Sequence, residues 1–245
     1  MTTMVLRDEV AWISGGSSGI GLATASRLQA LGARVAVLDV VASTDPNVAF
    51  AECDISSAAA VAEAARTLEG ELGPPTILVA CAAITGSAAL SEFPDDLWRR
   101  LLDVNLTGTF QLVRKVFAGM CARRRGRIVL FSSDAAARPL SGHAGYAATK
   151  AAVIALGRVA ATEGGPYGVT CNVISPGVVD TPAARRRWDS RDQLVHAVQN
   201  SPIRNLLGVV LDADDIAEAV AFLVSPASRH VTGQTLHVNA GGHLH

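Results

Sequence analysis

Residues 10–31 read VAWISGGSSGIGLATASRLQAL, and this stretch decides the fold class of the chain. Residues 10–14 are a short apolar run that predicts a buried strand, and a turn of glycine and serine follows them. Residues 20–31 then have the apolar spacing of a helix, which Gly32 ends. A strand, a tight turn and a helix in direct succession predict the first part of a strand–helix–strand unit in a parallel sheet.

The same alternation of strand and helix continues along the sequence. It predicts an α/β fold, a single Rossmann-type doubly wound parallel sheet with helices on both faces. Neither a linker nor an internal repeat is visible, so residues 1–245 are expected to form one domain. Further strands are predicted at residues 34–40, 48–52, 76–80, 127–132, 169–174 and 234–238. Helices are predicted at residues 57–72, 144–163 and 214–224, with one or two in 95–124 and an irregular or helical excursion in 182–199.

The composition argues against nucleic-acid and membrane partners. The 245 residues carry a formal net charge of −1, and the densest basic run, residues 123–127, lies at a predicted helix end. The four cysteines lie far apart without metal-binding spacing, so we expect reduced thiols and no metal site. No apolar run reaches the roughly 18 residues that span a bilayer, and a polar segment, not a signal peptide, precedes the first strand. These features predict a cytoplasmic protein.

Glycines in the turn after the first strand predict a nucleotide-binding loop. Their spacing is GxxxGxG, between a strand and a helix. Glycine lets the backbone turn tightly and lets a pyrophosphate approach it, and the start of a helix attracts an anion. An ordinary glycine-rich turn is the alternative interpretation of this spacing alone. The predicted contacts to a cofactor are Gly15, Ser17, Ser18, Gly19, Ile20 and Gly21.

Asp39 indicates which dinucleotide fits this loop. It lies at the end of the second predicted strand, about 20 residues beyond the turn, where a carboxylate can accept hydrogen bonds from the adenosine ribose. The same charge repels the 2′-phosphate of NADP, and no arginine stands in the turn or directly after Asp39 to bind that phosphate. We therefore predict NAD as the cofactor.

Tyr146 and Lys150 form the candidate proton-transfer pair. Four residues apart on a predicted helix, they share one face. A nearby ammonium favours a phenolate, so we expect Lys150 to lower the pKa of Tyr146. Ser133 follows the fifth predicted strand, where its hydroxyl can hydrogen-bond a substrate oxygen in the same crevice. A tyrosine and a lysine at this spacing are common, and the preceding nucleotide loop makes the pair specific.

Together these motifs resemble the short-chain dehydrogenase/reductase family over essentially the whole chain. The matching segments are Gly15-x-x-x-Gly19-Ile20-Gly21, Cys53-Asp54-Ile55, Asp103-Val104-Asn105-Leu106, Ser132-Ser133, Tyr146-Ala147-Ala148-Thr149-Lys150, Asn172-Val173-Ile174-Ser175-Pro176-Gly177, Val231-Thr232-Gly233-Gln234 and Asn239-Ala240-Gly241-Gly242. One segment departs from the family pattern, because Ala80-Cys81-Ala82-Ala83 stands where the family usually has Asn-Asn-Ala-Gly. This departure puts local rigidity in doubt more than chemistry.

The resemblance implies a role for each matching residue. Tyr146 exchanges a proton with the substrate oxygen, Lys150 lowers the pKa of Tyr146 and holds the nicotinamide ribose, and Ser133 orients the substrate. Asn105 holds a water that links Lys150 to solvent. The implied further contacts to the cofactor are Asp54, Ile55, Cys81, Tyr146, Lys150, Pro176, Val179 and Thr181.

Within the family, the chain most resembles dehydrogenases of cyclic alcohols and dihydrodiols. The expected substrate is therefore a secondary alcohol on a small ring, with or without a carboxylate. Residues 182–207 lie where this architecture places a substrate lid and are rich in arginine, which binds carboxylates bidentately. NAD as cofactor favours oxidation as the direction. The candidate substrate contacts are Ser133, His143, Arg185 and Trp188.

Two alternatives stay open at this point. One is a 3-oxoacyl or polyketide-type ketoreductase, and the other is a catalytically silent dinucleotide-binding sensor. The resemblance also implies a homotetramer, and the alanine-rich helix in residues 144–163 would allow close packing between subunits.

Overall fold

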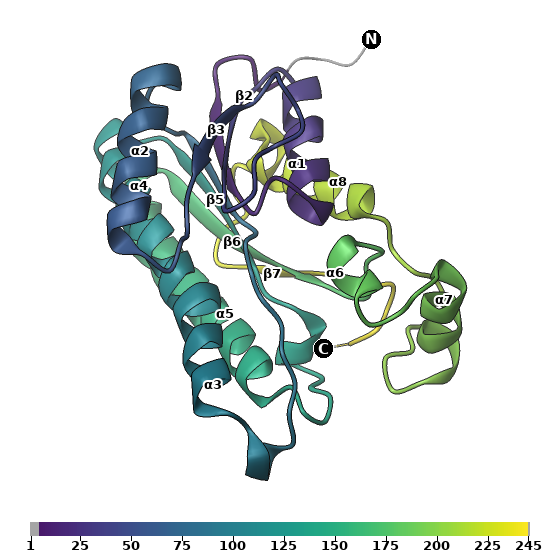
Figure 1. Cartoon of the computed structure of the whole chain (residues 1–245). Helices are drawn as coiled ribbons and strands as arrows, with labels where there is room; N and C mark the ends of the chain where they lie inside the picture. The colour runs from purple at the N-terminus through teal and green to yellow at the C-terminus, as the bar shows by residue number, and fades with distance from the viewer. Residues whose placement is uncertain (1–4, 245) are drawn as a thin grey trace.

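The computed structural model describes residues 5–244, which form layers around a seven-stranded sheet (Figure 1). All strand pairs are parallel, in the order β3-β2-β1-β4-β5-β6-β7. This order confirms the predicted doubly wound sheet. Residues 1–4 and 245, which the single-domain expectation also covers, lie outside the described residues. The strands are β1 (Val10–Ser14), β2 (Arg34–Asp39), β3 (Ala49–Glu52), β4 (Ile77–Ala80), β5 (Gly126–Phe131), β6 (Val169–Pro176) and β7 (Thr235–Val238).

Helices cover both faces of the sheet (Figure 1). One face carries α1 (Gly19–Ala30) and α8 (Ala213–Val224), which pack against each other. The other face carries α2 (Ala58–Leu72), α4 (Thr109–Arg123) and α5 (Ala144–Gly164). The remaining helices are α3 (Asp95–Leu101), α6 (Pro182–Arg185) and α7 (Arg191–Asn200), with short helical turns η1 (Leu90–Glu92), η3 (Asp134–Ala136), η4 (Gly165–Tyr167) and η5 (Pro226–Ser228). Among residues 5–244, no helix combines the length and the apolar content needed to cross a membrane.

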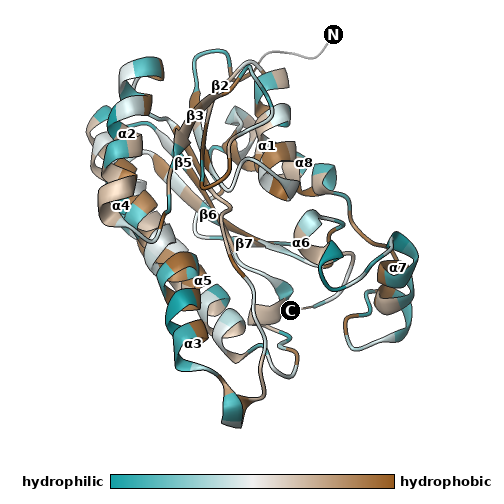
Figure 2. Cartoon of the chain, in the orientation of Figure 1, coloured by the Kyte–Doolittle hydropathy of each residue, from teal (hydrophilic) through white to brown (hydrophobic). Residues whose placement is uncertain are grey.

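Two apolar cores hold these layers together, one on each face of the sheet. The strands are largely hydrophobic in Figure 2. Their residues contribute to a core on each face, because helices cover both faces of a parallel sheet. On one face, Leu68, Leu112 and Val153 from α2, α4 and α5 pack against the sheet. On the other face, α1 and α8 contribute Leu28 and Val220. The rigid sheet between the two cores fixes the positions of the loops at its edge.

The segment between β4 and β5 departs from a simple pair of helices. Residues 95–124 were expected to hold one or two helices, and the structure shows α3 and α4 joined by η2 (Leu102–Gly108), a π-helical segment. A wider helical turn of this kind often occurs at functional sites. Here it carries Asn105, one of the candidate catalytic residues.

The order in which the chain adds strands to the sheet reverses between β1 and β4. From β1 the chain proceeds to β2 and β3 on one side, and then to β4 on the other side. The carboxyl ends of β1 and β4 are joined by a hydrogen bond of 3.2 Å from the amide of Cys81 to the carbonyl oxygen of Ser14. Ligands of open α/β sheets bind beyond the strand ends at such a reversal. The glycine turn after β1 lies at this point.

Candidate active site

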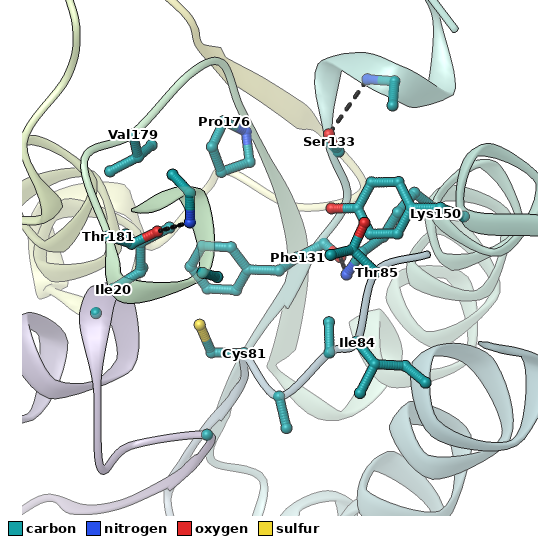
Figure 3. A pocket seen from close by; sticks show the side chains of 18 of the residues that line it. Ile20, Cys81, Ile84, Thr85, Phe131, Ser133, Lys150, Pro176, Val179 and Thr181 are labelled. Atoms are coloured by element: carbon teal, nitrogen blue, oxygen red, sulfur yellow. Dashed lines mark hydrogen bonds between the residues drawn. The ribbon is translucent and has the colours of Figure 1, made fainter. Parts of the chain in front are cut away.

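A cavity of about 1000 Å³ lies beyond the carboxyl ends of the strands. Figure 3 shows Ser133 and Lys150 on one side of this cavity, Val179 and Thr181 on the other, and Cys81 between them. Within the part of the chain that the structure describes, no group of three His, Cys, Asp or Glu side chains could hold a metal ion. The predicted site residues that line the cavity are Gly15, Ser18, Gly19, Ile20, Gly21, Asp39, Asp54, Ile55, Cys81, Ser133, His143, Tyr146, Lys150, Pro176, Val179, Thr181 and Trp188. Ser17, Asn105 and Arg185 are not among the lining residues.

The glycine turn requires glycine for steric reasons. Gly15 has a φ of +70°, and a Cβ atom there would lie 2.8 Å from the backbone of Ala82. A Cβ on Gly21 would lie 2.0 Å from the carbonyl oxygen of Gly15, so the turn packs directly on α1. Ser18, which precedes α1, makes no side-chain cap with the helix. The turn therefore offers a cradle without side chains and a helix start without a side-chain cap, which fits a pyrophosphate.

Asp39 connects the glycine turn to the end of β2. Its Oδ2 accepts a hydrogen bond of 3.1 Å from the amide of Ser17, and its Oδ1 accepts one of 3.2 Å from the amide of Val41. The Ser17 hydroxyl donates to the carbonyl oxygen of Val41 at 2.6 Å. Ser17 thus stabilises the turn from outside the cavity, while the Asp39 carboxylate lines it. A carboxylate at this place fits the ribose hydroxyls of a dinucleotide.

The adenosine side of the cavity is formed by the segment after β3. Asp54 accepts hydrogen bonds from the amide and the hydroxyl of Ser56, at 2.9 and 2.7 Å. Ile55 is buried and fills the space beside Gly108, where a Cβ would lie 2.7 Å from the Ile55 side chain. Three features along the chain therefore fit a dinucleotide. They are the glycine turn that begins at Gly15, the Asp39 carboxylate and the apolar side chain of Ile55.

Lys150 lies almost completely out of contact with solvent on α5. Its side chain extends to the end of β5, where Nζ donates a hydrogen bond of 2.9 Å to the carbonyl oxygen of Phe131. Nζ also lies 5.8 Å from the centre of the Tyr146 ring. Burial lowers the pKa of Lys150 to about 8, because an apolar environment disfavours the charged amine.

Tyr146 and Ser133 meet on the same side of the cavity. A side-chain hydrogen bond with Ser133 lowers the pKa of Tyr146, but burial is the larger effect and raises this pKa above its usual value. The expectation that Lys150 lowers the Tyr146 pKa is therefore wrong for this structure. The physical reason is that burial outweighs the hydrogen bond with Ser133, while the Lys150 amine donates its hydrogen bond to the carbonyl oxygen of Phe131 and not to the phenol. Tyr146 is best suited to donate a proton at neutral pH.

Asn105 is fully buried and braces the wall of the site. Its Oδ1 accepts a hydrogen bond of 2.8 Å from the amide of Ile84, and its Nδ2 donates to the Ile84 carbonyl oxygen at 2.9 Å and to the Thr149 hydroxyl at 3.2 Å. Asn105 thereby holds the segment after β4 against α5. These hydrogen bonds hold the segment after Cys81, whose rigidity the departure from the family pattern put in doubt. A water held by Asn105 stays a prediction.

The arginines of residues 182–207, the predicted lid, differ in their contacts. Arg185 binds Asp180 bidentately at 2.6 and 2.7 Å, and Arg191 binds both Asp180 and Asp212. These contacts fix the lid, and the structure does not bring Arg185 to the cavity. Arg186 and Arg187 line the cavity instead. The sequence shows that Arg185 is next to these two arginines. It does not show that Arg185 pairs with Asp180, which keeps Arg185 away from the cavity while Arg186 and Arg187 line it.

The C-terminal segment supplies lining residues that the sequence motifs did not assign. Asn239 and Gly242 line the cavity beside Asp134, and the Asn239 amide donates to Oδ1 of Asp134 at 2.8 Å. Arg138 donates hydrogen bonds to the carbonyl oxygens of Gly242 and Arg204. The C-terminal segment and the lid are therefore both tied to the loop that follows Ser133. The glycines within residues 239–242 were the feature of the sequence that could have indicated this part of the cavity wall.

Comparisons with known proteins agree with this geometry. A family model described as Enoyl-(Acyl carrier protein) reductase matches residues 15–243. The chain is 37% identical to the short-chain reductase protein NovJ of Streptomyces niveus, over 97% of this chain and 95% of the relative. It is 33% identical to the 3-oxoacyl-[acyl-carrier-protein] reductase FabG of Escherichia coli strain K12, over 98% and 100% of the two chains.

Two further proteins show the same degree of likeness. The 2,3-dihydro-2,3-dihydroxybenzoate dehydrogenase of Bacillus subtilis strain 168 is 32% identical, over 100% of this chain and 99% of the relative. A solved structure described as a short chain dehydrogenase/reductase family protein superposes with a TM-score of 0.85 at 32% identity. The superposition covers 97% of this chain and 98% of that chain. These identities are too similar to separate one substrate from another.

Proposed function

Because this chain belongs to the short-chain dehydrogenase/reductase family, and is therefore an oxidoreductase, we propose that it oxidises a secondary alcohol on a small ring with NAD. The observation that carries the proposal is that one cavity joins two halves. A glycine cradle bordered by Asp39 forms the first half, and Ser133, Tyr146 and Lys150 form the second. A dinucleotide and an alcohol carbon can therefore meet there.

NAD is proposed over NADP because of the Asp39 carboxylate. A ribose with two hydroxyls can donate hydrogen bonds to it, whereas a 2′-phosphate would bring a second negative charge against it. The backbone amides of Ser17 and Val41 already hold this carboxylate at the cavity edge. A protein that used both dinucleotides equally would contradict the proposal.

The proton transfer is assigned to Tyr146. Ser133 hydrogen-bonds the substrate oxygen and Tyr146 exchanges the proton with the same oxygen, because both side chains line the same cavity. Lys150, which is anchored on Phe131, provides a cation close to the Tyr146 ring. When bound, the nicotinamide supplies the hydride chemistry. The transfer is reversible, and the raised pKa of Tyr146 makes oxidation faster as the pH rises.

A ring alcohol is the proposed substrate class, supported by the likeness to the dihydrodiol dehydrogenase of Bacillus subtilis. The alternative is a ketoreductase of 3-oxoacyl thioesters, which the likeness to FabG supports. A Tyr146 that is protonated at neutral pH can donate the proton which that reduction needs, whereas oxidation needs the deprotonated phenolate. Turnover of a cyclic diol carboxylate with NAD, compared with a linear 3-oxoacyl thioester with NADPH, distinguishes the two. Cofactor binding without turnover of any alcohol would instead favour a silent sensor.

The remaining features of the proposal concern assembly and location. We propose a homotetramer that works in the cytoplasm, binds a small-molecule substrate and has neither nucleic-acid nor membrane partners. The alanine-rich face of α5 supports close helix packing between subunits. Light scattering measures the assembly directly, and a monomeric mass would contradict it.

A further inference from the structure

Arg187 is a cation of the cavity wall that pairs with no carboxylate among residues 5–244. It lies in the turn after α6, is exposed, and lines the cavity. Its Nη1 lies 3.5 Å from Nε2 of His143, and its guanidinium carbon lies 4.9 Å from the centre of the Trp188 ring. Among the ion pairs recorded within residues 5–244, none includes Arg187. Its charge is therefore available to an anionic ligand.

Two neighbouring arginines are instead engaged with protein carboxylates. Arg185 and Arg191 are both engaged with Asp180, and Arg191 also binds Asp212. The N–H groups of these two guanidinium groups bind protein carboxylates, and these ion pairs stabilise the predicted lid. Arg187 has no such role in the lid, and it contacts a histidine and a tryptophan that also line the cavity.

The aromatic contact prepares Arg187 to bind a carboxylate. A guanidinium that lies over a ring uses its face for that contact and keeps its N–H edges for a planar, bidentate partner. Trp188 is itself held in place, because it packs against the small core of Leu194, Val198 and Val210. The guanidinium is thus partly ordered before a ligand arrives, which reduces the entropy lost on binding.

The contact with His143 places Arg187 at the end of α5 that carries Tyr146. His143 immediately precedes α5, three residues before Tyr146. His143, Tyr146 and Arg187 all line the same cavity. An anion bound by Arg187 would therefore share this cavity with the hydroxyl from which Tyr146 takes the proton. This arrangement suits a carboxylate on the same small ring as the reacting alcohol.

We propose that Arg187, held by Trp188 and His143, binds the carboxylate of a carboxylated ring alcohol and so determines substrate specificity. The inference rests on the proposed function, and it moves the carboxylate contact from Arg185 to Arg187. Charge-assisted bidentate pairs of this kind are among the stronger contacts in proteins. Loss of the guanidinium is expected to weaken carboxylate binding about 10- to 100-fold.

Equilibrium binding to the protein loaded with NADH tests the inference without turnover. Calorimetry compares 2-hydroxycyclohexanecarboxylate with its carboxamide, which has the same shape and no charge. The unmodified protein is expected to bind the carboxylate about tenfold or more tightly than the carboxamide. Arg187→Ala removes this preference, and Arg187→Lys keeps part of it, because lysine retains the charge and loses the bidentate geometry.

Arg186→Ala is the matched control, because Arg186 also lines the cavity but has no recorded contact with His143 or Trp188. It is expected to keep most of the preference. Unchanged NADH binding by Arg187→Ala shows that the variant is folded. No preference in the unmodified protein, a preference that survives Arg187→Ala, or an equal loss in Arg186→Ala would overturn the inference.

Turnover of the carboxamide with NAD tests the proposed function separately. An Arg187-dependent preference without any turnover would support the carboxylate site and contradict the dehydrogenase. Turnover without a carboxylate preference would contradict the carboxylate site and leave the dehydrogenase intact.

Discussion

The Nζ atom of Lys150 lies 2.9 Å from the carbonyl oxygen of Phe131, so the last residue of β5 holds the amine of the active site. The amine is buried here, and burial lowers the Lys150 pKa to about 8. In the unfolded chain the same amine has its ordinary pKa of about 10.4. Folding therefore costs more free energy at pH values where the amine must be buried in its charged form.

The first prediction is a pH dependence of stability that Lys150 causes. Between about pH 8 and pH 10.5 the unfolded chain binds a proton that the folded protein has lost, so the free energy of unfolding rises with pH in this window. The contribution is up to about 3 kcal/mol. Urea unfolding across this pH range measures it. In Lys150→Met this part of the rise is expected to disappear, and a variant with the same pH dependence as the unmodified protein would contradict the buried charge.

Tyr146→Phe tests the proton transfer. The change removes only the phenolic hydroxyl, so kcat is expected to fall about 1000-fold while NADH binding stays within about twofold. Tyr167→Phe is the matched control, because Tyr167 is the only other tyrosine and is exposed outside the cavity. Steady-state kinetics and fluorescence titration measure the two quantities. More than a tenth of the activity remaining in Tyr146→Phe would refute the assignment.

Asp39→Ala is expected to weaken NAD binding about 10- to 100-fold and to relax the preference over NADP. Two causes combine, since the carboxylate borders the ribose site and also holds the amides of Ser17 and Val41. Asp39→Asn separates them, because the amide keeps an acceptor and removes the charge. Titration of both variants with both dinucleotides is the measurement. If Asp39→Asn gained no NADP affinity, charge repulsion would not explain the preference.

Asn105→Ala is expected to destabilise the protein by about 1–3 kcal/mol, since it leaves the half-buried amide and carbonyl of Ile84 without their side-chain partner. Asn200→Ala serves as the control, because its side chain is exposed and donates only to the carbonyl of His196. Urea unfolding gives both values. Equal stability of the two variants would mean that Asn105 does not brace the site.

The cofactor half of the site could be predicted from the sequence because local backbone geometry determines it. A strand followed by GxxxGxG fixes the turn at Gly15, and Asp39 follows at the end of the adjacent strand whatever the rest of the chain does. The spacing of Tyr146 and Lys150 likewise places both on one helical face.

Other features depend on contacts between distant segments, and the sequence could not supply them. Which arginine of the lid faces the cavity is decided by the pairing of Arg185 with Asp180 and of Arg191 with Asp212. The pKa of Tyr146 depends on burial and on the direction of the Lys150 side chain. Asn239 reaches the cavity because β7 pairs with the end of β6.

The central claim is the oxidation of a ring alcohol by NAD with Tyr146 as the proton acceptor, and one measurement tests it most directly. Formation of NADH is followed with the unmodified protein and with Tyr146→Phe, over a panel of cyclic alcohols and dihydrodiols with and without a ring carboxylate. We predict NADH formation that depends on Tyr146, is greatest for a carboxylated ring and is faster than the reduction of a linear 3-oxoacyl thioester with NADPH. Faster reduction of the thioester, or no NADH formation from any ring alcohol, would contradict the account.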